Sequence, residues 1–203
     1  MTKKNVLFVV VPLHNKTMMT TRCVLGAINN PLRSNTMNIF MLHDDSEITA
    51  QMHCDKHVPK MILETAQMLS TAWRIADNDY ADKHAMYKAA YKNHPSTVWV
   101  RHGILNYLWT RSLFKHLCQE YTHRYGKHHA SERLLEAFFT DVPYETCLIR
   151  EPIPFPQCMP DQYKVDGDPV TAYRNYYKGE KAYFAKWAKG TEAPSWWHDS
   201  VYA

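Results

Sequence analysis

Four ionisable side chains in the segment QMHCDKHVPKMILE have a spacing that could bring them together. They follow one another at intervals of four, three and four residues and are His53, His57, Lys60 and Glu64. Such intervals place side chains on one face of a helix, provided that the helix is continuous. Pro59 either kinks that helix or begins a new one at its first turn. In both cases Lys60 and Glu64 stay one turn apart.

Three kinds of chemistry fit this pattern. Lys60 and Glu64 could form an ordinary surface ion pair, which contributes about a few tenths of a kcal/mol. His53 and His57 could bind a metal, as in zinc peptidases, but that motif has a glutamate directly after its first histidine, where this chain has Cys54. A half-buried Glu64 could instead transfer protons beside an amine that attacks carbon. We favour this acid–base and amine site, and we expect no metal ion.

A second pattern, of basic residues interleaved with aromatic ones, lies in the segment AYRNYYKGEKAYFAKW. Arg174, Lys178 and Lys181 form a strip beside the face that carries Tyr173 and Tyr177. This arrangement suits contacts with phosphates and stacking on bases. The alternative is a core helix whose lysines extend along apolar surface to reach solvent.

Three further residues are candidates for DNA contact. Arg101, on the preceding long helical segment, could extend the basic surface. Trp196 and Trp197, close to the C-terminus, are candidates for exposed base stacking.

The elements that must position these residues are mostly helical. Apolar periodicity and capping residues predict helices over 46–56, 60–76, 79–93, 97–126, 130–139 and 170–190. The segment between 142 and 169 holds six prolines and predicts an ordered loop. We therefore expect a mostly α protein, a compact helical bundle with a proline-rich loop and a possible small strand element near the N-terminus. The expected division is an N-terminal extension, 1–36, and a helical domain, 37–203.

Composition restricts the class of protein. Of the 203 residues, 45% are hydrophobic and 22% charged, which is ordinary for a globular chain. The net charge of +4 permits a nucleic-acid partner without requiring one. Five cysteines without a CxxC pair favour reduced thiols and the cytoplasm, and no apolar run reaches the ~20 residues that a membrane helix needs. The chain has no Walker-type loop and no GxGxxG, so we expect no nucleotide cofactor.

Several segments together resemble a family of small proteins encoded mainly by bacteriophages. They are HCDKHVPKMILETAQML, NHPSTVWV, CQEYTHRYGK, PFPQCMPDQYK and AYRNYYKGEKAYFAKW. The resemblance extends from about Met37 to Trp197. It implies an action in the cytoplasm of the host cell.

More distantly, the helix with Glu64 and the layout NHP…W…C-E are similar to pyrimidine-dimer DNA glycosylases of the endonuclease V type. Those all-helical enzymes flip a base out of the duplex, attack the sugar C1′ with an N-terminal α-amine, and use a helical glutamate for the proton and Schiff-base steps. The resemblance implies that Glu64 is the catalytic glutamate and that His53, His57 and Lys60 form the polar face around it.

The nucleophile is where this chain departs from that pattern. Removal of Met1 would expose an α-amine on Thr2, far ahead of Glu64 in sequence. Translation from Met37 would fit the family's spacing better, although Asn38 does not favour removal of the initiator methionine. Lys60 or Lys56 could instead supply the amine.

The sequence thus predicts an enzyme that excises or modifies a damaged or modified pyrimidine base in DNA. The alternative is a phage accessory factor that binds DNA or a protein without catalysis.

Overall fold

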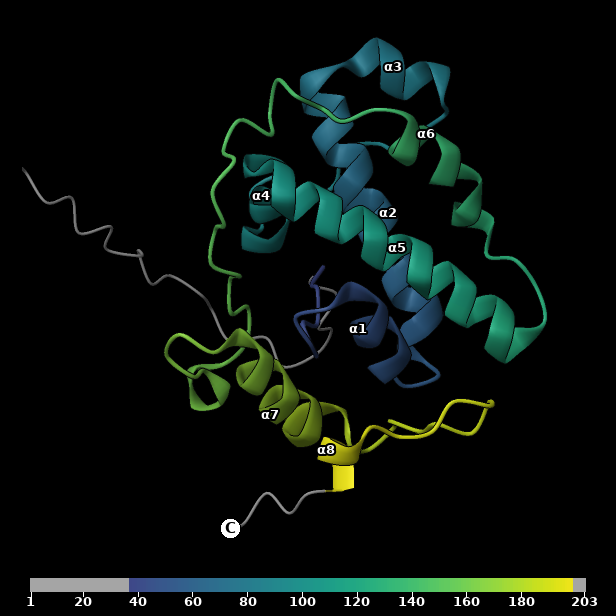
Figure 1. The fold of residues 1–203 in the computed structure, drawn as a ribbon, viewed down its shortest axis with the longest axis vertical. Helices are drawn as coiled ribbons and strands as arrows, with labels where there is room; N and C mark the ends of the chain where they lie inside the picture. Colours follow the sequence, from purple (N-terminus) through teal and green to yellow (C-terminus); the bar gives the residue numbers. More distant parts are fainter. Residues whose placement is uncertain (1–36, 199–203) are drawn as a thin grey trace, which may run out of the picture. The chain divides into compact units, whose positions relative to one another are not determined.

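Two long helices form the centre of the fold. The computed structural model describes residues 37–198, and within them α2 (His57–Ala76) packs against α5 (Ile104–Tyr125), which crosses it in Figure 1. α1 (Ser46–Met52) lies on α5, and Asp45 caps its first turn by accepting hydrogen bonds from the main-chain N–H of Glu47 and Ile48. The mostly α prediction is confirmed.

The remaining helices are short and surround this pair (Figure 1). They are α3 (Asn78–Lys83), α4 (Pro95–His102), η1 (Ala130–Leu134), α6 (Leu135–Thr140), η2 (Asp161–Tyr163), α7 (Pro169–Lys181) and α8 (Ser195–His198). Residues 37–198 contain no strand; 37–42 are a buried, non-helical segment, and most of the predicted strand element lies outside the described residues. Within this same part of the chain, none of the helices combines the length and apolar character that a bilayer crossing requires.

The predicted helix over 46–56 is wrong in its second half. α1 ends at Met52 because His53 adopts an extended conformation, with ψ of 138°. A new helix, α2, starts at His57 with Pro59 in its first turn. Proline is tolerated there because main-chain N–H groups of the first turn have no partner within the helix, so the missing N–H of proline costs no helical hydrogen bond. The helix is therefore not continuous, so the condition for a single stripe from His53 to Glu64 is not met. Of the two alternatives for Pro59, the structure has the new helix with the proline in its first turn.

Two other predicted helices end early. The helix expected over 79–93 stops at Lys83, and the main chain beyond it is held by Arg74, which donates to the carbonyl oxygens of Met86 and Tyr87. The helix expected over 170–190 stops at Lys181. The long segment 97–126 is divided at Gly103 into α4 and α5. At the break between α4 and α5 the N–H of Ile104 donates to the carbonyl of Ile149, a long-range contact that periodicity does not reveal.

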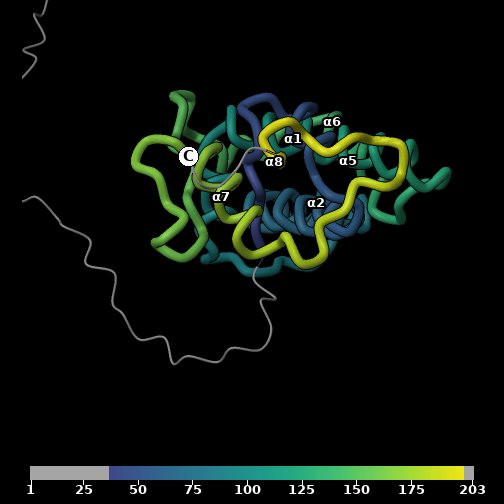
Figure 2. The backbone as a smooth tube through the Cα atoms, turned by 90° about the horizontal axis from the view of Figure 1, so that it is seen from below, coloured from purple at the N-terminus to yellow at the C-terminus, as the bar shows by residue number. Residues whose placement is uncertain are grey.

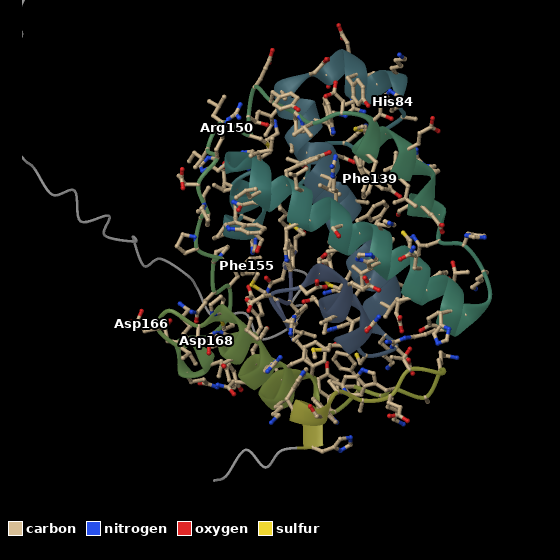
Figure 3. All side chains as sticks on the ribbon, in the orientation of Figure 1. His84, Phe139, Arg150, Phe155, Asp166 and Asp168 are labelled. Atoms are coloured by element: carbon tan, nitrogen blue, oxygen red, sulfur yellow. The ribbon has the colours of Figure 1, made fainter. Side chains whose placement is uncertain are left out.

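The proline-rich segment is a loop, as predicted, with η2 as its only helical turn. It packs on the helices because Trp99 donates to the carbonyl of Ile153 at 2.9 Å and its ring lies 4.7 Å from that of Phe155. Figure 3 shows Phe155 beside the helices and Asp166 at the outer edge of the turn before α7. The loop thus connects α6 to α7 as a packed part of the fold.

The segment after α7 runs back along the start of α2 (Figure 2). The main-chain N–H of Asp55 donates to the main-chain carbonyl of Lys186 at 2.9 Å. The main-chain N–H of Ala188 donates to the Asp55 carboxylate at 2.8 Å. The Trp187 indole donates to the carbonyl of Met52. The turn between α1 and α2 is therefore enclosed from this side.

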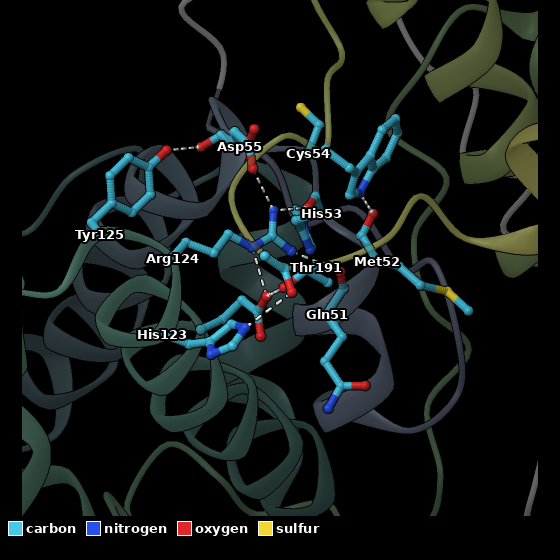
Figure 4. Close-up of polar contacts among 12 residues, drawn as sticks. Gln51, Met52, His53, Cys54, Asp55, His123, Arg124, Tyr125 and Thr191 are labelled. Atoms are coloured by element: carbon cyan, nitrogen blue, oxygen red, sulfur yellow. Dashed lines mark hydrogen bonds and ion pairs between the residues drawn. The ribbon is translucent and has the colours of Figure 1, made fainter.

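A buried arginine holds the same turn from the side of α5 (Figure 4). The Arg124 side chain has no exposed surface, and its guanidinium donates to the carbonyls of Gln51 and His53 and to the carboxylates of Asp55 and Glu120, at 2.6–3.0 Å. The last carbonyl oxygens of a helix have no hydrogen-bond partner within the helix. The planar guanidinium group presents several N–H donors in a fixed geometry and can bond to more than one of these oxygens. Arg124 thus fixes where α1 ends and α2 begins.

We predict that Arg124→Met destabilises the protein by about 3–5 kcal/mol, because it leaves two carboxylates buried without their cation. The matched control is Arg150→Met, at an exposed surface position, for which we expect a change within about 0.5 kcal/mol. Urea unfolding of both variants measures the difference. A loss below about 1 kcal/mol for Arg124→Met would contradict the assigned role.

Two histidines are buried in an aromatic cluster beside this turn. His53 is fully buried and donates from Nδ1 to the carbonyl of Thr49 at 2.7 Å. His57 stacks on Phe40 at 4.8 Å and lies edge-on to Tyr177 at 5.0 Å. Burial lowers the pKa of His53 to about 4 and that of His57 to about 2. Both rings are therefore neutral in the folded protein near neutral pH.

These depressed pKa values predict that acid destabilises the fold. Between about pH 6.5 and pH 4 the unfolded chain binds protons that the folded chain excludes, so each histidine removes about 1.4 kcal/mol of stability per unit fall in pH. His57→Phe, which retains an aromatic ring, should make this slope shallower. Tyr144→Phe, at a position that is 58% exposed and has no group that ordinarily titrates between pH 5 and pH 7, should leave it unchanged. Unfolding free energies at pH 7 and pH 5 test this, and equal slopes for the wild type and His57→Phe would refute it.

Candidate functional site

The site is centred on a carboxylate that α2 holds at the edge of the core. Glu64 lies one turn after Lys60, and the Lys60 Nζ is 3.1 Å from Glu64 Oε1. Met61 and Ile62 point into the core from the same helix, which turns the two charged residues outward. The Glu64 side chain is only 14% exposed, whereas that of Lys60 is 40% exposed. The carboxylate is therefore more desolvated than its partner.

The second partner of Glu64 is a main-chain nitrogen. The N–H of Asn38 donates to Glu64 Oε2 at 3.1 Å, from the buried segment that precedes α1. One carboxylate oxygen thus contacts the ammonium group of Lys60, and the other contacts Asn38 N. Two nitrogen atoms of different chemistry lie within hydrogen-bond distance of the same carboxyl group.

This environment shifts the proton affinity of the carboxyl group. Burial raises the pKa of Glu64, while the Lys60 charge and the Asn38 hydrogen bond lower it by less, so that the pKa is raised from its ordinary value. A carboxyl group with a raised pKa can both take up and release a proton closer to neutral pH. The geometry is therefore suited to general acid–base chemistry.

The Asn38 side chain connects this site to three other elements. Its Nδ2 donates to the carbonyl of Cys158 at 3.0 Å, and its Oδ1 accepts from the hydroxyl of Tyr173 at 3.0 Å and from Ser96 at 3.4 Å. Sequence reasoning did not identify Asn38, Ser96 or Tyr173 as site residues. The one available signal was a lone amide inside the apolar run MNIFML.

An open groove lies between the start of α4, the proline-rich loop and α7. Its volume is about 590 Å³, and its lining residues are His94, Pro95, Pro156, Gln157, Cys158, Met159, Pro160, Lys164 and Tyr176. Cys158 belongs to both the groove and the Asn38 contacts. Tyr176 and Lys60 are close enough for the Lys60 charge to lower the pKa of the Tyr176 hydroxyl, against a larger rise caused by burial. Glu64, Lys60 and Asn38 are not among the lining residues, and the connection from the groove to the carboxylate passes through Cys158 and Asn38.

The structure brings some of the predicted catalytic residues together and leaves others apart. Glu64 and Lys60 form the predicted pair. His53 and His57 are 0% and 4% exposed, and both lie in the aromatic cluster instead of on a common polar face with Glu64. Thr2 lies outside the described residues.

The predicted DNA-contacting cations are in different environments. Lys181 lies next to the groove, with Nζ 3.4 Å from the Tyr176 hydroxyl. Lys178 is one turn earlier on α7 and partly exposed. Arg174 donates to the carbonyl of Leu42 at 2.9 Å, and Arg101 donates to that of Lys92 at 2.5 Å. Both arginines therefore bind the main chain of the protein itself.

Most of the aromatic residues near the C-terminus belong to the core. Trp196 is 6% exposed, so the prediction that it offers an exposed face for stacking is wrong. Trp197 is half-buried and packs on Trp187 with ring centroids 4.9 Å apart. Tyr173 and Tyr177 are fully buried, which makes the aromatic face of α7 a core face. Burial against α1, α2 and the proline-rich loop explains these positions.

The histidines do not form a metal centre with their neighbours in the structure. Among residues 37–198, no three His, Cys, Asp or Glu side chains are placed to hold one ion. The buried histidine rings contact aromatic side chains and a main-chain carbonyl instead.

One of three comparisons with known proteins found a similarity. Residues 37–133 match the model of a family described as pyrimidine dimer DNA glycosylase. No curated protein and no solved structure gives a significant match. The matched residues, just under half of the chain, include Asn38, Lys60, Glu64 and His94, whereas the proline-rich loop and α7 lie beyond them. Over this segment, the chain is similar to the pyrimidine dimer DNA glycosylases, and the resemblance predicted from its sequence is confirmed.

Proposed function

We propose that this protein is a DNA glycosylase that excises a damaged pyrimidine base, with Glu64 as its acid–base residue. The observation that carries the proposal is the half-buried Glu64 carboxylate between two nitrogen atoms, Lys60 Nζ and Asn38 N, each at 3.1 Å. The similarity of residues 37–133 to pyrimidine dimer DNA glycosylases supports the same reaction class. Excision requires a base to leave the stack, and the groove beside Asn38 offers space outside a duplex.

Cations near the groove suit a phosphate backbone. Lys164 lines the groove, Lys181 contacts its Tyr176, and Lys60 lies beside Glu64. Phosphate contacts position a nucleic acid without reading its sequence, which is what an enzyme that acts on lesions requires. Arg174 and Arg101 stabilise the protein in this proposal, because their donors are bonded to main-chain carbonyls.

The attacking nitrogen is best supplied at Asn38. Lys60 Nζ contacts Glu64 Oε1, so Lys60 is placed to orient that carboxylate. An α-amine has an ordinary pKa of about 7.7–8.0, so about a tenth of it is unprotonated at pH 7, a far larger fraction than for a lysine side chain with an ordinary pKa of about 10.4. A chain that begins at Asn38 has an α-amine at the atom that contacts Glu64. The proposal therefore includes translation from Met37 and removal of that methionine, a step that Asn38 does not favour. Lys60 then acts as the electrostatic partner, and the α-amine of Thr2 is the candidate that lies outside the described residues.

The proposed reaction transfers bonds and protons at one sugar carbon. The amine forms a bond to C1′ as the C1′–N bond to the base breaks, and the base leaves with the electron pair and takes up a proton. The sugar ring opens at O4′, which receives the second amine proton and leaves an imine at C1′. Glu64 transfers these protons. Its carboxylate then removes a C2′ proton as the 3′ phosphate leaves, and water hydrolyses the imine to free the amine.

His53 and His57 contribute to this site through packing. His53 lies in the turn before α2. His57 is the first residue of α2, the helix that carries Lys60 and Glu64. Because His57 is enclosed by Phe40 and Tyr177, it fixes the start of α2 against the segment that holds Asn38. We therefore propose a positioning role for the two histidines.

We predict that Glu64→Gln lowers cleavage of the C1′–N bond at a cyclobutane pyrimidine dimer in a duplex, read as formation of the abasic sugar, by about 10²- to 10⁴-fold, because the amide cannot exchange a proton. Its fold and its affinity for the duplex should be retained. The control is Glu145→Gln, at an exposed position, which should act like the wild type. Full activity of Glu64→Gln would leave a non-catalytic binding factor as the better account.

Lys60→Met tests the electrostatic role of the lysine. The Lys60 charge lowers the pKa of Glu64, so its removal should raise that pKa further and move the acidic limb of the kcat/KM profile upward by ~1 pH unit. Lys127→Met, in the exposed turn after α5, should not move it. An unchanged acidic limb would rule out the electrostatic role. Complete loss of activity together with loss of any covalent intermediate would identify Lys60 as the nucleophile.

A further inference from the structure

A half-buried ammonium group at the end of α7 has no counter-ion in the described part of the chain. Lys181 is the last residue of this helix, and its Nζ lies 4.7 Å from the centroid of the Tyr176 ring and 3.4 Å from the Tyr176 hydroxyl oxygen. Glu180, the next residue in sequence, accepts from the Tyr163 hydroxyl at 2.9 Å instead. No carboxylate of residues 37–198 forms an ion pair with Lys181. Its charge is therefore not neutralised within this part of the protein.

This ammonium group is close to Lys60 at the start of α2. Phe40 connects the two helices, because its ring stacks on His57 at 4.8 Å and on Tyr176 at 6.0 Å. Burial lowers the pKa of Lys181 from its ordinary value, and the Lys60 charge lowers it further. An ammonium group that is partly desolvated and faces a second one costs free energy, which a bound anion would offset.

The Tyr176 hydroxyl is a second donor at this position. Burial raises the pKa of Tyr176 above its ordinary value, so the hydroxyl keeps its proton near neutral pH. The ammonium group of Lys181 can only donate, so its contact with Tyr176 leaves the hydroxyl proton free. An ammonium group beside an O–H donor suits the oxygen atoms of a phosphate ester.

The proposed reaction develops negative charge on a phosphate next to Glu64. When Glu64 takes the C2′ proton, the electron pair of that C–H bond forms a C2′–C3′ double bond, and the C3′–O3′ bond breaks with its electron pair on the oxygen. The diester has a single negative charge, whereas the departing monoester has about two. Lys60 Nζ is already 3.1 Å from Glu64 Oε1. Lys181 is a nearby cation that no described carboxylate occupies.

We propose that Lys181 and Tyr176 bind the 3′ phosphate of the reacting nucleotide and stabilise the charge that develops on it as the C3′–O3′ bond breaks. This inference rests on the proposed function and adds the residues that assist strand cleavage. Cleavage of the C1′–N bond places no new charge on this phosphate, so the two residues should act mainly on the later step. Both lie beyond the family-matched residues 37–133, and their role is assigned from contacts alone.

The test separates the two bond-breaking steps in single turnovers at saturating protein. We expect Lys181→Met to lower strand cleavage at an abasic site by about 10- to 100-fold. Formation of the abasic sugar at a pyrimidine dimer should change by about threefold or less. Lys181→Arg, which keeps the charge, should restore most of the cleavage rate. Lys186→Met, at an exposed position after α7, also removes one positive charge and should alter neither step.

A neutral linkage identifies the phosphate that is contacted. When the 3′ linkage of the abasic site is a methylphosphonate, it starts without a charge and leaves with one fewer. The difference between the wild type and Lys181→Met should then shrink to about threefold or less. With the methylphosphonate at the 5′ linkage, the full difference should remain.

Three results would overturn the inference. The first is unchanged strand cleavage by Lys181→Met while the wild type is active. The second is an equal loss of both steps, which would indicate a structural role or a general contribution to DNA binding. The third is a difference that shrinks with the 5′ neutral linkage instead of the 3′ one. A wild-type protein that acts on neither substrate would instead remove the proposed function, and the role of Lys181 with it.

Discussion

The buried guanidinium of Arg124 is the constraint from which the arrangement of the site follows. It binds the main chain where α1 ends and the carboxylate of Asp55, and Asp55 in turn binds the main chain of the segment after α7. A buried ion pair is weak evidence for stability, since desolvation offsets much of the attraction. Its consequence here is geometric, because the break between α1 and α2 sets the direction in which α2 presents Lys60 and Glu64.

The reactivity of the site depends on a balance between burial and charge. Burial raises the pKa of Glu64, and Lys60 on the same helix opposes that shift. Asn38 adds a contact that no residue of α2 could make, since it reaches Glu64 from 26 residues earlier in the chain. The side chain of Asn38 is in turn fixed by Tyr173 and Cys158, which lie beyond the family-matched segment. The C-terminal third of the chain therefore shapes a site whose acid–base residue lies in the matched part.

The sequence predicted those features that depend on local spacing. The helix that carries Lys60 and Glu64, the pairing of these two residues and the proline-rich loop all follow from intervals of four residues or from proline geometry. The break at His53 did not follow, because a residue 71 positions away stabilises it. The burial of Trp196 was also missed, since its indole packs on Met52, 144 positions earlier. Asn38 was missed for the same reason.

The central claim, that a nitrogen beside Glu64 becomes bonded to the DNA sugar, is tested most directly by borohydride trapping with peptide mapping. The full chain and a chain that begins at Asn38 are each incubated with dimer-containing or abasic DNA, reduced, digested and sequenced by mass spectrometry. We predict a covalent adduct on the α-nitrogen of Asn38 in the shorter chain, at the atom 3.1 Å from Glu64 Oε2. No adduct in either chain, or an adduct on a residue remote from Glu64, would contradict the account.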